Sequence, residues 1–105
     1  MDKGIFLSVV IPAYNEEHRI GRTLEAVDAY LSKQLFDYEV IVVSDGSSDK
    51  TADVVKEYAK RIKGLVLFDN YKNNGKGYVV KQGMSKANGK FRLFMDADNA
   101  VPSEY

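Results

Sequence analysis

The sequence predicts an α/β fold in which a parallel sheet is covered by helices on both faces. Three observations indicate this fold. Segments with strand character alternate with segments of helical period, in the order β-α-β-α-β-α-β. The strand segments are continuously apolar, as in parallel strands that are buried on both faces. A polar cluster follows each strand segment, and ligands of such sheets bind beyond the carboxyl ends of the strands.

Four short apolar runs are expected to form the strands. The first covers residues 7–11, is rich in β-branched side chains and is stopped by Pro12. The second covers residues 38–44 and the third covers residues 65–68. The fourth run, at residues 91–95, also reads as a buried strand. Short β-branched or aromatic runs of this length are typical of strands rather than of helices.

Three helices are expected between these strands. Residues 15–17 cap and charge the start of the first helix, which extends to about residue 34. Residues 45–49 form a turn with an N-cap before the second helix, and Gly64 ends that helix. The residues expected on the inward face of the first helix are Ile20, Leu24, Val27, Leu31 and Leu35. Those of the second helix are Val54, Val55, Tyr58 and Ile62, and those of the third are Val79, Val80, Gly83, Met84 and Ala87.

Length and composition favour one small, partial domain over residues 1–105. Fifteen basic and fifteen acidic residues balance, which argues against a nucleic-acid partner or an anionic membrane surface. The chain has no cysteine, which excludes disulfides, thiolate metal sites and a cysteine nucleophile. No apolar run approaches the roughly 20 residues of a membrane span. These features indicate a cytoplasmic location, either free or peripheral at the cytoplasmic face of a membrane.

Asp96-Ala97-Asp98 is the most informative feature of the chain. Residues two apart on a strand point the same way, so the two carboxylates leave the strand end side by side, roughly 6–7 Å apart along the backbone. Two like charges at that distance repel each other unless a cation lies with them. A hard divalent ion with oxygen ligands is the natural partner, and Mg²⁺ in such sites usually also binds substrate phosphates. A polar turn after a strand would have the same residues.

The other polar clusters suit a nucleotide with a diphosphate. Tyr14 offers a stacking surface for a base, Glu16 an acceptor for a ribose hydroxyl, and Asp45 an acceptor for a base N–H. Gly75-Lys76-Gly77 offers backbone N–H groups and one ammonium for phosphates. Each also has an ordinary structural explanation: a partly buried aromatic, a first-turn glutamate facing the helix dipole, a turn aspartate and a flexible helix entry.

Four motifs together resemble those of a known family. They are residues 8–17 (SVVIPAYNEE), 42–51 (VVSDGSSDKT), 74–77 (NGKG) and 96–98 (DAD). In order and spacing they are similar to the family-two inverting glycosyltransferases with the GT-A fold, above all to the dolichyl-phosphate glucose and mannose synthases. The resemblance covers almost the whole chain and implies that the fold is the Rossmann-like nucleotide-binding half of a GT-A domain.

The resemblance also implies roles for individual residues. The residues implied to bind the nucleotide sugar are Pro12, Ala13, Tyr14, Glu16, Asp45, Lys76, Asp96 and Ala97. Asp98 matches the metal-binding aspartate of the D-x-D motif, with Asp96 beside it, and the implied cofactor is Mg²⁺ or Mn²⁺. The chain departs from the family pattern at Ser44, where the family has an acidic residue, and at Ala100, where some relatives have glutamine. No catalytic residue is assigned.

The activity implied by the resemblance is transfer of a sugar, with inversion, from a UDP- or GDP-linked donor to an acceptor such as the lipid phosphate dolichyl phosphate. In the family the acceptor site follows the D-x-D motif, so the chain is expected to form the donor-binding half. An exposed sheet edge would then favour self-association.

Two other interpretations stay open. One is a nucleotide-binding module without catalysis, or a truncated fragment without the acceptor half. The other is a different doubly wound domain, such as a receiver or a nucleotidyltransferase, for which the acidic segment at residues 13–17 is a poor match.

Overall fold

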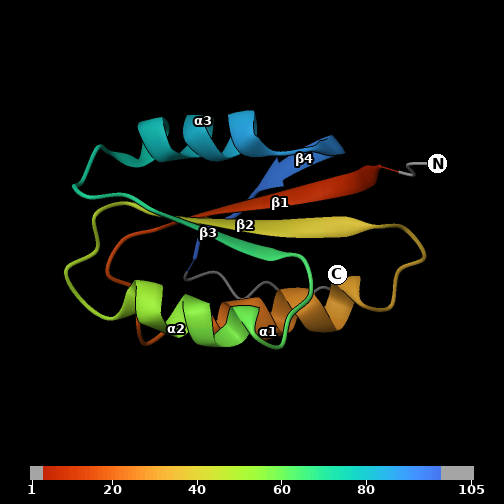
Figure 1. Ribbon diagram of the computed structural model, residues 1–105, viewed down its shortest axis with the longest axis horizontal. Helices are drawn as coiled ribbons and strands as arrows, with labels where there is room; N and C mark the ends of the chain where they lie inside the picture. The colour runs from red at the N-terminus through yellow and green to blue at the C-terminus, as the bar shows by residue number, and fades with distance from the viewer. Residues whose placement is uncertain (1–3, 98–105) are drawn as a thin grey trace.

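The computed structural model describes residues 4–97. The elements occur in the predicted order: β1 (Ile5–Ala13), α1 (Ile20–Leu31), β2 (Tyr38–Ser44), α2 (Thr51–Ala59), β3 (Leu65–Asp69), α3 (Lys76–Lys86) and β4 (Gly89–Phe94). Helices α1 and α2 cover one face of the sheet and α3 covers the other, so the molecule has three layers (Figure 1). The predicted fold class is confirmed. Within residues 4–97, no helix is both long enough and apolar enough to span a bilayer.

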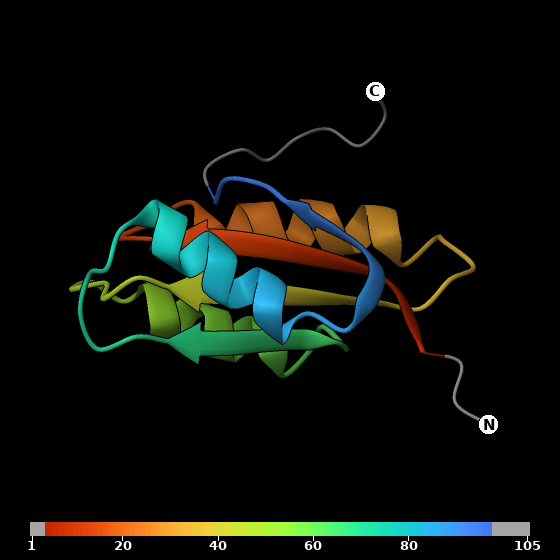
Figure 2. The same ribbon diagram turned by 90° about the horizontal axis from the view of Figure 1, so that it is seen from above.

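The sheet has four parallel strands in the order β3-β2-β1-β4. The chain first builds outward from β1 through β2 to β3, and then returns to place β4 on the other side of β1. Strands β3 and β4 therefore lie at opposite edges, while α3 crosses the face between them (Figure 2). The strand order reverses between β1 and β4, which is where ligands bind in sheets of this kind.

The prediction that the fourth strand is buried is wrong. Strand β4 pairs with β1 alone within the described sheet, and Leu93 is 50% exposed. Its neighbours Phe91 and Phe94 are also exposed. An apolar run looks the same at the centre of a sheet and at its edge, because the strand order is set by tertiary packing and not by local composition.

Strand β1 continues through Pro12 instead of stopping before it. The backbone N–H of Met95 donates to the carbonyl of Val10 at 3.0 Å, so the polar groups of Val10 face β4. Alternation along the strand turns the nitrogen of Pro12 to the same side, beyond the last paired residues of β1 and β4. Proline has no N–H, and it stands two residues beyond Val10, where the paired register of β1 with β4 ends. On the other side, Pro12 still pairs in register with Val43 of β2.

Two apolar clusters hold the layers together. The larger lies between the sheet and the α1–α2 layer and contains Val9, Ile11, Ile20, Leu24, Leu31, Val40, Val42, Val55 and Ile62. The smaller lies under α3 and contains Ile41, Val43, Val79 and Ala87. Gly83 lets α3 approach the sheet closely, because a Cβ there would lie 2.4 Å from Cγ1 of Val10.

Two helices end earlier than the sequence predicts. Helix α1 ends at Leu31, and Leu35 is fully exposed, so its predicted place on the inward face is wrong. Helix α2 ends at Ala59, and Ile62 is buried from the turn that follows rather than from the helix. Gly64 does not end α2; it adopts φ +87° just before β3, which is the left-handed region that glycine occupies readily.

Candidate functional site

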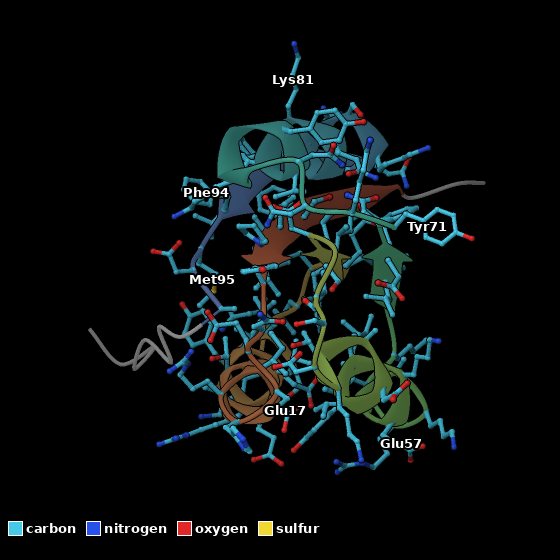
Figure 3. All side chains as sticks on the ribbon, turned by 90° about the vertical axis from the view of Figure 1, so that its left-hand side faces the viewer. Glu17, Glu57, Tyr71, Lys81, Phe94 and Met95 are labelled. Carbon is cyan, nitrogen blue, oxygen red and sulfur yellow. The ribbon has the colours of Figure 1, made fainter. Side chains whose placement is uncertain are left out.

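A cavity of about 300 Å³ opens at the carboxyl ends of the strands. It is lined by Pro12, Ala13, Tyr14, Glu16, Asp45, Lys76, Val79, Asp96 and Ala97. Figure 3 looks onto this edge of the sheet, with Phe94 and Met95 on one side and Tyr71 on the other. All eight residues predicted to bind the nucleotide sugar thus line one cavity; Asp98 lies outside the described residues. Val79 was predicted only as a core residue, and its helical spacing gave no sign that it also lines the cavity.

The first loop of the rim, between β1 and α1, is tied to the second, between β2 and α2. The Asn15 side-chain oxygen accepts from the backbone N–H of Ser48 at 2.8 Å and of Asp49 at 3.3 Å. In return, the N–H of Glu16 donates to the Thr51 hydroxyl at 2.8 Å. Asn15 has φ +53°, a conformation that asparagine tolerates better than most residues.

The prediction that residues 15–17 cap α1 is therefore wrong. Among residues 4–97, no side chain caps the start of that helix, and its N-cap position is Arg19. Asn15 and Glu17 bond to the neighbouring loop instead: the Glu17 carboxylate accepts from the Lys50 N–H at 2.7 Å. These partners are more than thirty residues away in the sequence.

The second loop is tied to the third through Asp45. This residue is 4% exposed, and its two carboxylate oxygens accept from the N–H groups of Asn74 at 2.7 Å and Gly75 at 3.0 Å. The same contact fixes the start of α3, which begins at Lys76. Gly46 lets the two loops meet, because a Cβ there would lie 2.3 Å from the backbone of Lys72. Each oxygen of Asp45 keeps a second lone pair that a ligand N–H can use.

Charged groups meet across the cavity. The Lys76 ammonium lies 2.5 Å from a carboxylate oxygen of Asp96 and 5.4 Å from the centre of the Phe94 ring. Glu16 forms an ion pair with Arg19 at 2.5 Å, and Tyr14 is half exposed. The cavity thus combines an aromatic face, carboxylates and one ammonium.

Asp49 is the rim carboxylate whose pKa departs most plainly from its usual value. Burial acts to raise its pKa, but hydrogen bonds from Thr51 and from the Glu17 N–H outweigh burial and hold the pKa below the usual range. The Thr51 N–H donates at 2.9 Å and the Glu17 N–H at 3.2 Å. The charged form of Asp49 is therefore part of the link between the first two loops.

Within residues 4–97, no group of three or more His, Cys, Asp or Glu side chains is arranged to hold a metal ion. Asp96 contributes one carboxylate at the cavity, and the second carboxylate of the motif, Asp98, lies outside the described residues. A hard divalent cation fits this donor set, since carboxylate oxygens are the ligands that Mg²⁺ prefers and phosphates of a substrate supply the rest.

Solved structures with the same fold include nucleotide complexes. A Staphylococcus aureus TarS fragment in complex with UDP-GlcNAc is 34% identical with a TM-score of 0.76, over 90% of this chain and 27% of that one. The mannosyltransferase PcManGT of Pyrobaculum calidifontis, in complex with GDP-Man and Mn²⁺, is 27% identical with a TM-score of 0.76, over 88% of this chain and 27% of that one. These neighbours are GT-A fold glycosyltransferases, so the predicted GT-A fold is confirmed.

Several curated relatives are named dolichyl-phosphate beta-glucosyltransferase. The Drosophila melanogaster protein is 44% identical over 102 residues, which cover 90% of this chain and 31% of the relative. The human protein is 39% identical over 102 residues, covering 90% of this chain and 32% of the relative. The chain therefore spans about a third of the length of these relatives. The family model described as glycosyl transferase family 2 matches residues 8–105, and the chain belongs to that family.

Proposed function

We propose that this chain binds the sugar donor of a glycosyl transfer reaction, and that the donor is UDP-glucose. The observation that supports this most is the single cavity lined by residues from all four polar clusters of the rim. The relatives named dolichyl-phosphate beta-glucosyltransferase support glucose as the sugar. The UDP-GlcNAc complex of a 34% identical neighbour supports uridine as the base.

In the proposed complex, the lining residues other than Val79 have defined tasks. Tyr14 stacks on the base, Asp45 accepts from a base N–H, and Glu16 accepts from a ribose hydroxyl. Pro12, Ala13 and Ala97 leave space for the nucleoside next to the backbone. Lys76 neutralises the charge of the diphosphate. To do so, its ammonium exchanges its present partner, the Asp96 carboxylate, for the phosphate oxygens.

We propose Mg²⁺ or Mn²⁺ as cofactor, held by Asp98 and Asp96. The Mn²⁺ in the Pyrobaculum mannosyltransferase complex supports a divalent ion. When bound, such an ion neutralises charge on the diphosphate leaving group. The residues of this chain then orient the anomeric carbon toward an acceptor, and attack from the opposite side inverts the configuration. The proposed acceptor is dolichyl phosphate, as the relatives' name suggests. The proposed location is the cytoplasmic face of a membrane.

A binding experiment tests the donor proposal. Thermal unfolding of the chain is measured with UDP-glucose, GDP-mannose, UDP and GDP, each with and without Mn²⁺. At a ligand concentration about 100 times the Kd, binding adds about 2.7 kcal/mol of stability, which raises Tm by about 10–20 °C for a domain of this size. We expect the largest increase with UDP-glucose and Mn²⁺. No increase with any nucleotide would contradict the proposal. A larger increase with GDP-mannose than with UDP-glucose would identify GDP-mannose as the donor instead.

Two variants test the metal proposal. Asp98→Ala is expected to remove the Mn²⁺-dependent part of the UDP-glucose affinity in calorimetry. Asp69→Asn changes an exposed carboxylate at the end of the edge strand β3 and serves as the matched control. Equal affinity of Asp98→Ala and wild type in the presence of Mn²⁺ would contradict the assigned ligand.

A transfer assay separates an enzyme from a binding module. Radiolabelled UDP-glucose is incubated with the chain, Mn²⁺ and dolichyl phosphate in detergent, and labelled lipid is extracted. The longer relatives are the positive control, because the chain spans about a third of their length. Binding without transfer would favour the module without catalysis for this chain.

We also propose that a second copy covers the β4 edge. Phe6, Phe91, Leu93 and Phe94 are each between 41% and 56% exposed. Together they expose roughly 400 Å² per copy, taking about 200 Å² for a whole side chain. Two copies bury about twice that area, which suits a weak, concentration-dependent dimer. Sedimentation velocity should show wild type associating with rising concentration and Leu93→Lys staying monomeric. A wild-type monomer at all concentrations would contradict the proposal.

A further inference from the structure

The backbone turns out of the sheet directly after β4, and Asp96 lies at this turn. The Met95 N–H donates to the Val10 carbonyl at 3.0 Å, which within residues 4–97 is the last hydrogen bond between β1 and this part of the chain. Two residues later, the Ala97 carbonyl accepts from the hydroxyl of Thr23 at 2.5 Å. Asp96 is thus held between one backbone bond to the sheet and one side-chain bond to α1.

Thr23 is well placed to fix this turn. It belongs to α1 and is 1% exposed, so its hydroxyl lies in the protein interior and not in solvent. Its partner Ala97 is 3% exposed and lines the cavity. The two residues are 74 positions apart in the sequence. A buried carbonyl without a donor is unfavourable, so the backbone at Ala97 depends on this hydroxyl for its position.

Ala97 also belongs to the larger apolar cluster, and Met95 packs against it, but apolar packing has no directional preference that would fix a carbonyl. The other directional contacts of this turn within residues 4–97 are weaker supports than the Thr23 hydroxyl. Strand β4 lies at an edge of the described sheet, with a paired neighbour on one side. The Asp96 side chain contacts Lys76, but both side chains are about half exposed, and exposed ion pairs fix geometry weakly. A buried hydrogen bond from a β-branched side chain on a helix is the more rigid support, because threonine has restricted χ1 rotamers there.

We propose that Thr23 is a positioning residue for the carboxylate of Asp96, and through it for the divalent cation and the diphosphate of the donor. This inference rests on the proposed function. Thr23 touches neither ligand; it holds the backbone from which Asp96 reaches the cavity. Groups that orient metal ligands in this indirect way typically change metal affinity 10- to 100-fold when they are removed.

The test uses a graded series at one position. Thr23→Val keeps the shape and removes the hydroxyl, and Thr23→Ser restores a hydroxyl on a smaller side chain. We expect Thr23→Val to lower the Mn²⁺-dependent affinity for UDP-glucose by about 10- to 100-fold and to leave the affinity for UDP without metal within about twofold. Thr23→Ser is expected to recover most of the metal-dependent affinity.

A control variant separates positioning from general destabilisation. Ser8 is a second fully buried hydroxyl, in β1, that bonds to Glu39 at 2.6 Å and to the Gly89 N–H at 2.8 Å. It lies about 16 Å along the strand from Ala13 at the cavity. Ser8→Ala should lower the urea midpoint and leave the Mn²⁺-dependent affinity unchanged. If Thr23→Val is too unstable to assay, Thr23→Cys replaces it, because a thiol is a weak donor.

The outcomes are distinct. The positioning role would be overturned if Thr23→Val lowered the affinity for UDP by the same factor with and without Mn²⁺. It would also be overturned if Ser8→Ala lowered the Mn²⁺-dependent affinity as much as Thr23→Val does. Either result would leave Thr23 only a structural role. Unchanged Mn²⁺-dependent affinity in Thr23→Val would overturn it as well. If wild type itself binds no nucleotide in the presence of Mn²⁺, the proposed function fails, and this inference fails with it.

Discussion

Replacing Asp45 by asparagine should destabilise the fold by about 3–4 kcal/mol. The buried carboxylate accepts two backbone N–H groups, from Asn74 at 2.7 Å and from Gly75 at 3.0 Å. Hydrogen bonds to a charged group contribute about 1.5–3 kcal/mol each. The asparagine amide keeps one acceptor oxygen, while its NH₂ group faces the second N–H. One charged bond is lost, the other becomes neutral, and one donor is left unpaired.

Urea denaturation of Asp45→Asn and wild type measures this difference. With a slope of about 1–3 kcal/mol per molar urea, the midpoint should fall by about 1 M or more, without a change in slope. Asp69→Asn is the control: this carboxylate is exposed, and such surface changes usually alter stability by less than about 0.5 kcal/mol. A midpoint of Asp45→Asn equal to that of wild type would refute the reasoning, because it would mean that the two bonds contribute nothing to holding the loop before α3.

Three further changes test other contacts. Gly83→Ala should lower stability by about 1–3 kcal/mol in urea, because its Cβ would lie 2.4 Å from Cγ1 of Val10, whereas Gly77→Ala, with open space around it, should not. Asn15→Gly keeps the φ +53° backbone but loses the side-chain bonds to the second loop, and should lower the urea midpoint; an unchanged midpoint would contradict that link. Asp49 has a folded-state pKa below its usual value, so its contribution is complete above the unfolded pKa of about 3.8 and is lost as pH falls through the folded value. Unfolding free energy between pH 6 and 2.5 should therefore fall less in Asp49→Asn than in wild type, and equal slopes would contradict this.

The strands could be predicted because local sequence patterns encode them. The meeting of the polar loops at one edge of the sheet could be predicted because it follows from the parallel order of the strands. β-Branched runs such as the one in β2 match the observed Tyr38–Ser44 strand, and parallel strands must end at one edge of the sheet. That geometry alone brings Tyr14, Asp45 and Lys76 to a common cavity. What these residues bind stays a prediction, since their contacts in the structure are with the protein itself.

The errors arose where distant contacts decide the structure. Asn15 has the sequence signature of a helix cap, yet its oxygen bonds to the loop at Ser48 and Asp49, which no local pattern shows. Leu35 continues the helical period, but the chain has already turned toward β2. Strand β4 has the composition of a central strand and lies at the edge, because the crossover from α3 places it beside β1.

Pro12 has a consequence for the floor of the cavity. Any other residue there would add a polar hydrogen directed toward the end of β4, beyond the last paired residues of the two strands. That hydrogen would need an acceptor from the backbone after β4, from water or from the bound molecule, and a nucleoside that displaced such a water would lose affinity. With proline at this position, the cavity can open between β1 and β4 without placing an additional N–H donor in its floor.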